Sequence, residues 1–250
     1  MVRVLVLLTA SAIAAPAAKP VSNLAERFGF NATVENADNC REYYADFTNY
    51  ALHPGWGQLQ GRTEASADGY RLINDDKGGS RMRFDWDFAA GEAVSYVAVT
   101  MRGAPDTGKN SYAILREPKC QDDFNKHNCD EIDMAELWGW RQNVEAHSFS
   151  YNPAVSDYGY ATPTPVFQVT ANANSQHHTY GLELRRGGKY WMRFNNQDVG
   201  GGWTQGPSAH AMKLYLGIWD CSTDFGSVCG PYFGRHSFMD VKSVWVKQCW

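Results

Sequence analysis

The chain has 250 residues, of which 44% are hydrophobic, 14% aromatic and 20% charged, and its formal net charge is −4. This composition excludes disordered, collagenous and low-complexity proteins. Neither sign of charge runs in blocks, so nothing indicates a nucleic-acid-binding surface. The length suits one large all-β or α/β domain, or two small ones.

The N-terminus has the pattern of a secretory signal peptide. Arg3 precedes an apolar run from Val4 to Ala15, and small residues that fit a signal-peptidase site follow. The run is too short to cross a bilayer, which takes about 20 residues. We therefore predict a signal peptide over residues 1–17, a single domain over 18–250, and a secreted protein of the extracellular space or cell wall.

The six cysteines are an even set in a chain predicted to enter an oxidising compartment, which favours disulfides. Proximity in the chain suggests Cys120–Cys129 and Cys221–Cys229, and leaves Cys40–Cys249 to join the two ends. A zinc site is the alternative, but there is no Cys-x-x-Cys pair. We predict disulfides and no metal.

Alternating polarity in short segments predicts strands. Arg81 to Phe88 alternates strictly between charged and apolar residues, which is the period of a half-buried strand. Gly187-Gly188 fits a hairpin turn. The other predicted strands, rich in β-branched or aromatic residues, are Ala93–Met101, Ser111–Leu115, Glu145–Tyr151, Thr179–Leu184, Tyr190–Asn195, Met212–Trp219 and Ser237–Lys247.

No window shows the apolar period of a long helix, so the chain is predicted to be mainly β. Many short strands in one domain of this size do not fit one open sheet without curling. We therefore expect two packed antiparallel sheets, in a sandwich or jelly roll.

The segment from Asp130 to Trp140 is the most informative for function. Glu131 and Asp133 share one face of a strand, because residues two apart point the same way. Strict alternation would turn Glu136 to the other face. One extra residue, a β-bulge around Met134-Ala135, restores its direction and brings three carboxyls to one face.

Carboxyls placed together titrate as a coupled set, and at least one keeps its proton towards neutral pH. Retaining glycoside hydrolysis needs such a set, with one ionised nucleophile and one protonated acid about 5–5.5 Å apart. A solvated strand face or a calcium site is the alternative. Ile132 and Met134 on the opposite face, and Trp138 and Trp140 close behind, are more than a solvated edge requires.

The segment Asp-Glu-Ile-Asp-Met-Ala-Glu resembles the signature of glycoside hydrolase family 16, in the bulged form Glu-x-Asp-x-x-Glu found in laminarinases and agarases. Looser similarities keep the order of that family over residues 131 to 246. They are His147, His178–Leu184, Lys189–Val199, Met212–Trp219 and Met239–Trp245.

The resemblance implies an all-β, concanavalin A-like jelly-roll β-sandwich of two curved antiparallel sheets with an open groove. It implies that Glu131 is the nucleophile, Glu136 the general acid/base and Asp133 an assisting carboxylate. The implied reaction is endo-acting, retaining hydrolysis of a β-linked polysaccharide, with a β-1,3- or β-1,3/1,4-glucan as the first expectation and no cofactor.

Aromatic side chains supply candidate sugar contacts, because rings stack on the apolar faces of sugars. Tyr215 and Trp219 share a strand face opposite three aliphatic residues, and Trp138 and Trp140 follow the acids. His147 reads as a structural histidine on the bare sequence, and only the resemblance makes it a substrate contact.

Two alternatives stay open. Met212–Trp219 is more similar to the transglycosylases of family 16 than to laminarinases, which favours transfer to a sugar hydroxyl instead of water. A non-catalytic lectin on the same fold is the other, although a lectin is expected to lack one of the three carboxyls. In either case we expect a monomer whose partner is a polysaccharide, with no nucleic acid and no membrane.

Overall fold

The structure is a computed structural model. It describes residues 28, 39–49, 52–75, 78–88, 93–118, 131–139, 143–146, 148–149, 167–170, 172–186, 189–203, 211–222, 229–231 and 236–250. The predicted signal peptide, Gly187-Gly188 and the predicted pair Cys120–Cys129 lie outside these residues.

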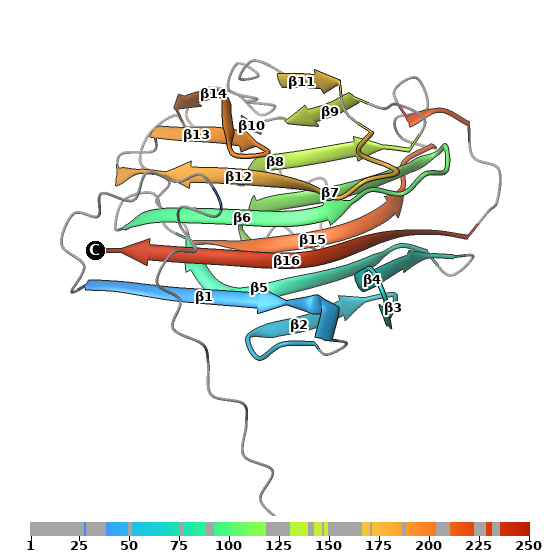
Figure 1. Cartoon of the computed structure of the whole chain (residues 1–250), viewed down its shortest axis with the longest axis horizontal. Coiled ribbons are helices and arrows are strands. Elements are labelled where there is room, and N and C mark those ends of the chain that lie inside the picture. The colour runs from blue at the N-terminus through green and yellow to red at the C-terminus, as the bar shows by residue number, and fades with distance from the viewer. Residues whose placement is uncertain are drawn as a thin grey trace, which may run out of the picture.

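The described residues form two antiparallel eight-stranded sheets that lie one over the other (Figure 1). Sheet A has the order β14-β13-β12-β6-β16-β4-β3, and β1 also pairs with β16. Its strands are β1 (Cys40–Asp46), β3 (Arg62–Ser66), β4 (Gly69–Asn74), β6 (Val94–Arg102), β12 (His178–Leu184), β13 (Lys189–Phe194), β14 (Gln197–Trp203) and β16 (Ser237–Cys249).

Sheet B has the order β11-β9-β8-β7-β15-β5-β2, and β10 also pairs with β8. A short 3-10 helix, η2 (Phe47–Asn49), follows β1. The strands of sheet B are β2 (Trp56–Gln60), β5 (Ser80–Phe88), β7 (Lys109–Arg116), β8 (Glu131–Trp138), β9 (Asn143–Ala146), β10 (Ser148–Phe149), β11 (Phe167–Thr170) and β15 (Met212–Asp220).

Apolar side chains from both sheets fill the space between the sheets and form the core. On β5, Met82, Phe84 and Phe88 are fully buried, as the alternation predicts, and Trp86 is partly buried against them. Burial of these side chains is the main favourable contribution to folding. Other strands add Leu72, Val97, Val99, Leu115, Ile132, Leu137, Leu182, Leu214, Leu216, Val244 and Val246.

All the strands predicted from alternation are present, with shifted ends. The segment Glu145–Tyr151 differs most, because it falls on two short strands, β9 and β10, where one was predicted. Alternating polarity did not predict the strands β1 to β4, β11 and β14. The β13–β14 hairpin turns at Asn195-Asn196, both with positive φ, as a two-residue type I′ turn requires.

The two ends of the described domain meet. The start of β1 lies beside the end of β16 (Figure 1), and the two strands pair from Cys40↔Cys249 to Asp46↔Ser243. Cys40 and Cys249 form a disulfide, and so do Cys221 and Cys229. Two of the three predicted disulfides are therefore confirmed.

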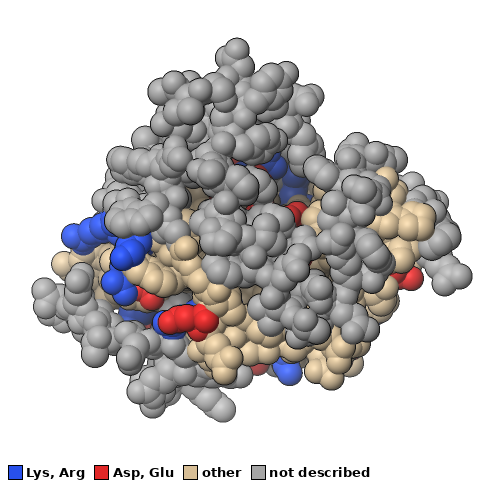
Figure 2. Space-filling model, turned by 90° about the horizontal axis from the view of Figure 1, so that it is seen from above, with Lys and Arg blue, Asp and Glu red and all other residues tan. Residues whose placement is uncertain are grey.

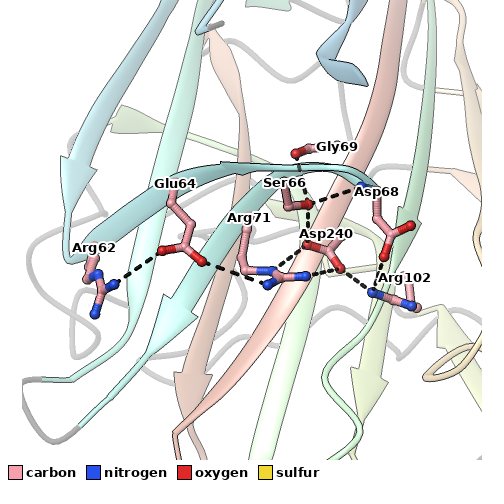
Figure 3. Close-up of polar contacts among 8 residues, drawn as sticks. All are labelled: Arg62, Glu64, Ser66, Asp68, Gly69, Arg71, Arg102 and Asp240. Carbon is pink, nitrogen blue, oxygen red and sulfur yellow. Dashed lines mark hydrogen bonds and ion pairs between the residues drawn. The ribbon is translucent and has the colours of Figure 1, made fainter. Parts of the chain in front are cut away.

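The outward face of sheet A carries a buried carboxylate, Asp240 on β16 (Figure 3). Arg71 donates from Nε to Asp240 Oδ1 over 2.8 Å, and Arg102 donates to Oδ2. Arg71 also donates from Nη2 to Oδ2 over 3.3 Å, and Ser66 adds a fourth hydrogen bond. The network joins β3, β4, β6 and β16 through side chains, in addition to the backbone ladder.

No helix in the described part of the chain has the length and apolar character needed to span a membrane.

Candidate active site

Strand β8 contains the predicted bulge. In its pairing with β7, Ala135 lies opposite Ala113 and Asp133 lies opposite Ile114, so Met134 is the extra residue on β8. A bulge places two consecutive residues against one partner and re-aims the side chains that follow. The prediction of a bulge at Met134-Ala135 is confirmed.

The bulge turns four apolar side chains of β8 to one side. Ile132, Met134, Ala135 and Leu137 belong to the core between the sheets. The acids point the other way: Glu131 and Glu136 are partly exposed, and Asp133 is 3% exposed. We call this side of sheet B the carboxylate face.

The three carboxyls interact with one another. Burial raises the pKa of Asp133 well above its ordinary value, and the charges of Glu131 and Glu136 raise it further. A hydrogen bond joins the carboxyls of Asp133 and Glu131. This hydrogen bond favours the protonated form of Asp133 and the ionised form of Glu131.

Glu131 experiences two opposed influences. Burial is the larger influence and raises its pKa above the ordinary value, while the charge of Arg116 and the hydrogen bond with Asp133 oppose that rise. Arg116 Nε lies 2.7 Å from Glu131 Oε2, and the Arg116 side chain is 14% exposed. The two side chains therefore form an ion pair.

Glu136 has a different neighbour on β7. Asn110 donates from Nδ2 to Glu136 Oε1 over 2.8 Å, and Asn110 is fully buried. A neutral amide thus faces Glu136, whereas a cation faces Glu131.

Two tyrosines lie beside the carboxyls on the carboxylate face. Burial raises the pKa of Tyr112 to about 12, against the charges of Arg81 and Arg116. Burial also raises the pKa of Tyr215, which hydrogen-bonds to Arg83. Gly217 gives Tyr112 its place, because a Cβ there would come within 2.3 Å of the Tyr112 hydroxyl oxygen.

The predicted aromatic contacts differ in exposure. Tyr215 and Trp138 are 1% and 5% exposed, so each presents little ring surface, whereas Trp219 is partly exposed. Trp138 and Trp219 pack together on the disulfide of Cys221 and Cys229. Trp219 is therefore the ring of these three that offers the larger surface to a sugar.

His147 and Trp140 lie outside the described residues. Arg116, Asn110 and Tyr112 are additional side chains of the site, which the sequence reasoning missed. The alternation of β7 could have pointed to these three residues, because they lie on the same strand face as Ile114. The predicted strand Ser111–Leu115 stopped one residue short of Asn110 and of Arg116.

Charges of both signs are mixed on the face of the molecule that Figure 2 shows. In the view of Figure 2, blue and red side chains lie next to one another, without a broad field of either sign among the residues drawn in colour. Among the described residues, no group of three or more His, Cys, Asp and Glu side chains is arranged to hold a metal ion.

No sequence-family profile matches the chain, and no curated protein matches it. Solved structures do. A Crh5 transglycosylase is 20% identical with a TM-score of 0.65, and the match covers 82% of this chain and 83% of that one. A lichenase, a β-1,3-1,4-glucanase from a mouse hindgut metagenome, is 17% identical with a TM-score of 0.64, over 82% and 98% of the two chains.

A laminarinase catalytic domain, an endo-1,3-β-glucanase of Thermotoga petrophila, is 10% identical with a TM-score of 0.62, over 83% of this chain and 96% of that one. At these identities the likeness establishes the fold. The predicted jelly-roll β-sandwich is confirmed, and it is the fold of family 16 glycoside hydrolases.

Proposed function

We propose that this chain is a secreted, retaining endo-β-glycanase that cleaves a β-linked polysaccharide by double displacement. The observation that carries the proposal is the set of three interacting carboxyls on bulged strand β8, in a fold shared with glucanases. The signal-peptide pattern and the disulfides favour secretion.

In the first step an oxygen of Glu131 attacks the anomeric carbon and the glycosidic C–O bond breaks. Glu136 gives its proton to the departing oxygen, and a covalent glycosyl ester forms on Glu131. In the second step Glu136 removes a proton from water, which attacks the same carbon and releases Glu131. Two inversions leave the anomeric configuration unchanged.

Asp133 supports this sequence through its hydrogen bond with Glu131. As a neutral donor it orients the Glu131 carboxylate and adds no negative charge beside it. The partly exposed ring of Trp219 is the proposed stacking surface for a sugar, and Trp138 packs in the same cluster. Tyr215, His147 and Trp140 are further proposed contacts.

A β-1,3- or β-1,3/1,4-glucan is the proposed substrate, because the similar structures include a laminarinase and a lichenase. Transglycosylation is the second candidate, favoured by the similarity to a Crh5 transglycosylase and by the sequence of Met212–Trp219. It uses the same glycosyl ester and resolves it with a sugar hydroxyl.

The test is a glycan panel of β-1,3-, β-1,4- and mixed-linkage glucans and galactans, with products identified by mass. The chain is expected to shorten one of the glucans. Glu131→Gln abolishes turnover, and Glu136→Gln slows it by about 10²–10⁴-fold on a substrate with a natural leaving group. Glu64→Gln, on sheet A, is the matched control and keeps full activity.

Products longer than the substrate would show that the chain acts as a transglycosylase and not as a hydrolase. Glycan binding without any cleavage across the panel would contradict the proposal of an enzyme and would favour the lectin. Full activity in Glu131→Gln would exclude the proposed nucleophile.

A further inference from the structure

Strand β7 brings a different polar side chain to each of the two catalytic glutamates. It lies between β8 and β15, and Arg116 at its end is paired with Glu131 in the strand register. Near its other end Tyr112 is paired with Glu136, and Asn110 follows two residues away on the same face. One strand therefore contacts both carboxyls.

At Glu131 the contact is a cation. Arg116 Nε lies 2.7 Å from Glu131 Oε2, so the two side chains form an ion pair. Both side chains are largely shielded from water, at 14% and 24% exposed, so solvent screens the pair less than it would at the surface. An arginine keeps its charge at all working pH values, so it favours the ionised form of Glu131 throughout.

At Glu136 the contact is a neutral amide. Asn110 donates from Nδ2 to Glu136 Oε1 over 2.8 Å. An amide N–H can donate a hydrogen bond to a carboxyl group in its ionised or its protonated form. An acid/base that gains and loses a proton needs a partner of this kind. Asn110 itself is fully buried, and its neighbour Lys109 is anchored by Asn74 and by Asp220.

We propose that Arg116 and Asn110 are positioning residues that assign opposite roles to two identical carboxyl groups. Arg116 holds Glu131 ionised for attack, and Asn110 orients Glu136 while leaving it neutral. The inference rests on the proposed retaining mechanism.

Other charged groups lie around the pair, among them Glu145 on β9, which is the register partner of Glu136. Asp133 lies between the two glutamates along the strand and interacts with both. Arg81 sits against Tyr112. Lys213, the register neighbour of Arg116 on β15, forms its ion pair with Asp87 at 2.9 Å.

Arg116→Gln tests the first half. With the cation removed, the pKa of Glu131 rises, so the acidic limb of kcat/KM against pH moves upward by about 1–3 pH units. The basic limb stays near its wild-type position. Arg116→Lys keeps the charge and retains most of the limb position, with a lower kcat because the guanidinium geometry is lost.

Arg62→Gln is the matched control, since Arg62 also pairs with one glutamate, at 3.2 Å, but lies on sheet A. Its profile is expected to superimpose on the wild type. Arg116→His covers the case in which Arg116→Gln does not fold. A histidine is cationic only below about pH 6.5, so the activity of this variant relative to Arg116→Lys falls as pH rises through that value.

Asn110→Asp tests the second half. A carboxylate in place of the amide opposes ionisation of Glu136, so the basic limb moves to higher pH while the acidic limb is less affected. A purely structural role for either residue would lower kcat or stability without moving the corresponding limb.

The outcomes separate this inference from the proposed function. Wild-type protein that cleaves no glycan in the panel contradicts the proposed function. Active wild-type protein whose acidic limb is unmoved in Arg116→Gln, or whose basic limb is unmoved in Asn110→Asp, overturns the positioning role alone.

Discussion

Asp133 shows how the site departs from what stability alone would favour. It is a carboxyl with 3% of its surface exposed, beside two other carboxyls, and burial raises its pKa well above the ordinary value. An acid whose folded-state pKa is raised destabilises the fold when it ionises. The destabilisation is absent at low pH and grows as the pH rises above about 3.9, the unfolded value.

Asp133→Asn is therefore expected to stabilise the protein at neutral pH while lowering kcat. The gain is about 1 kcal/mol or more, or about 2–4 °C in the melting temperature of a chain of this size. Thermal melts of the two proteins should differ at pH 7–8 and converge near pH 3.

Asp85→Asn is the control for this experiment. Asp85 is 53% exposed on β5 of the same sheet, so its neutralisation should give no gain that grows with pH. Equal effects of the two substitutions, or a gain for Asp133→Asn only at low pH, would contradict the assigned state of Asp133.

At the scale of the element, strand β8 was predictable and its neighbour β7 was only partly so. The position of three acids among apolar residues required one extra residue at Met134-Ala135, and the pairing with β7 contains it. Arg116 and Asn110 gave no such signal. Their roles depend on which strand pairs with β8, and register between segments distant in the chain is not visible in either segment alone.

The buried ion pairs of sheet A lead to a testable prediction about stability. Asp240 is 0% exposed and bound by Arg71 and Arg102, whereas Glu64, which also contacts Arg71, is 40% exposed (Figure 3). Asp240→Asn is expected to lower the free energy of unfolding by about 1.5–3 kcal/mol, because it removes hydrogen bonds to charged groups.

Glu64→Gln removes one carboxylate from the same cluster and should change the free energy of unfolding by less than about 1 kcal/mol, since exposed ion pairs contribute little. Urea denaturation of the two variants measures the difference. Equal losses would show that burial of Asp240 does not decide its contribution.

At the scale of the whole molecule, the strand alternation predicted two packed antiparallel sheets, and the resemblance to family 16 implied that they form a jelly roll. The pairings Cys40–Cys249 and Cys221–Cys229 also followed from the positions of the cysteines. The sequence of strands within each sheet did not follow. Segments far apart in the chain, such as β6 and β16, lie side by side in sheet A, and alternation carries no information about partners.

The exposure of the aromatic side chains could not be predicted from the sequence either. Tyr215 and Trp219 share a strand face, as predicted, yet one is 1% exposed and the other partly exposed. The difference arises from neighbouring strands: Tyr215 lies near the arginines of β5, and Trp219 packs on a disulfide. Composition establishes an aromatic surplus, and only the assembled sheets divide it between core and surface.

The most direct test of the proposed mechanism is to trap the glycosyl ester. The chain would be incubated with an activated 2-deoxy-2-fluoro β-glycoside of the sugar it cleaves, followed by intact mass and peptide mapping. The mechanism predicts one stable adduct on Glu131 that is absent from Glu131→Gln. An adduct on Glu136, or cleavage that inverts the anomeric configuration with no adduct, would contradict it.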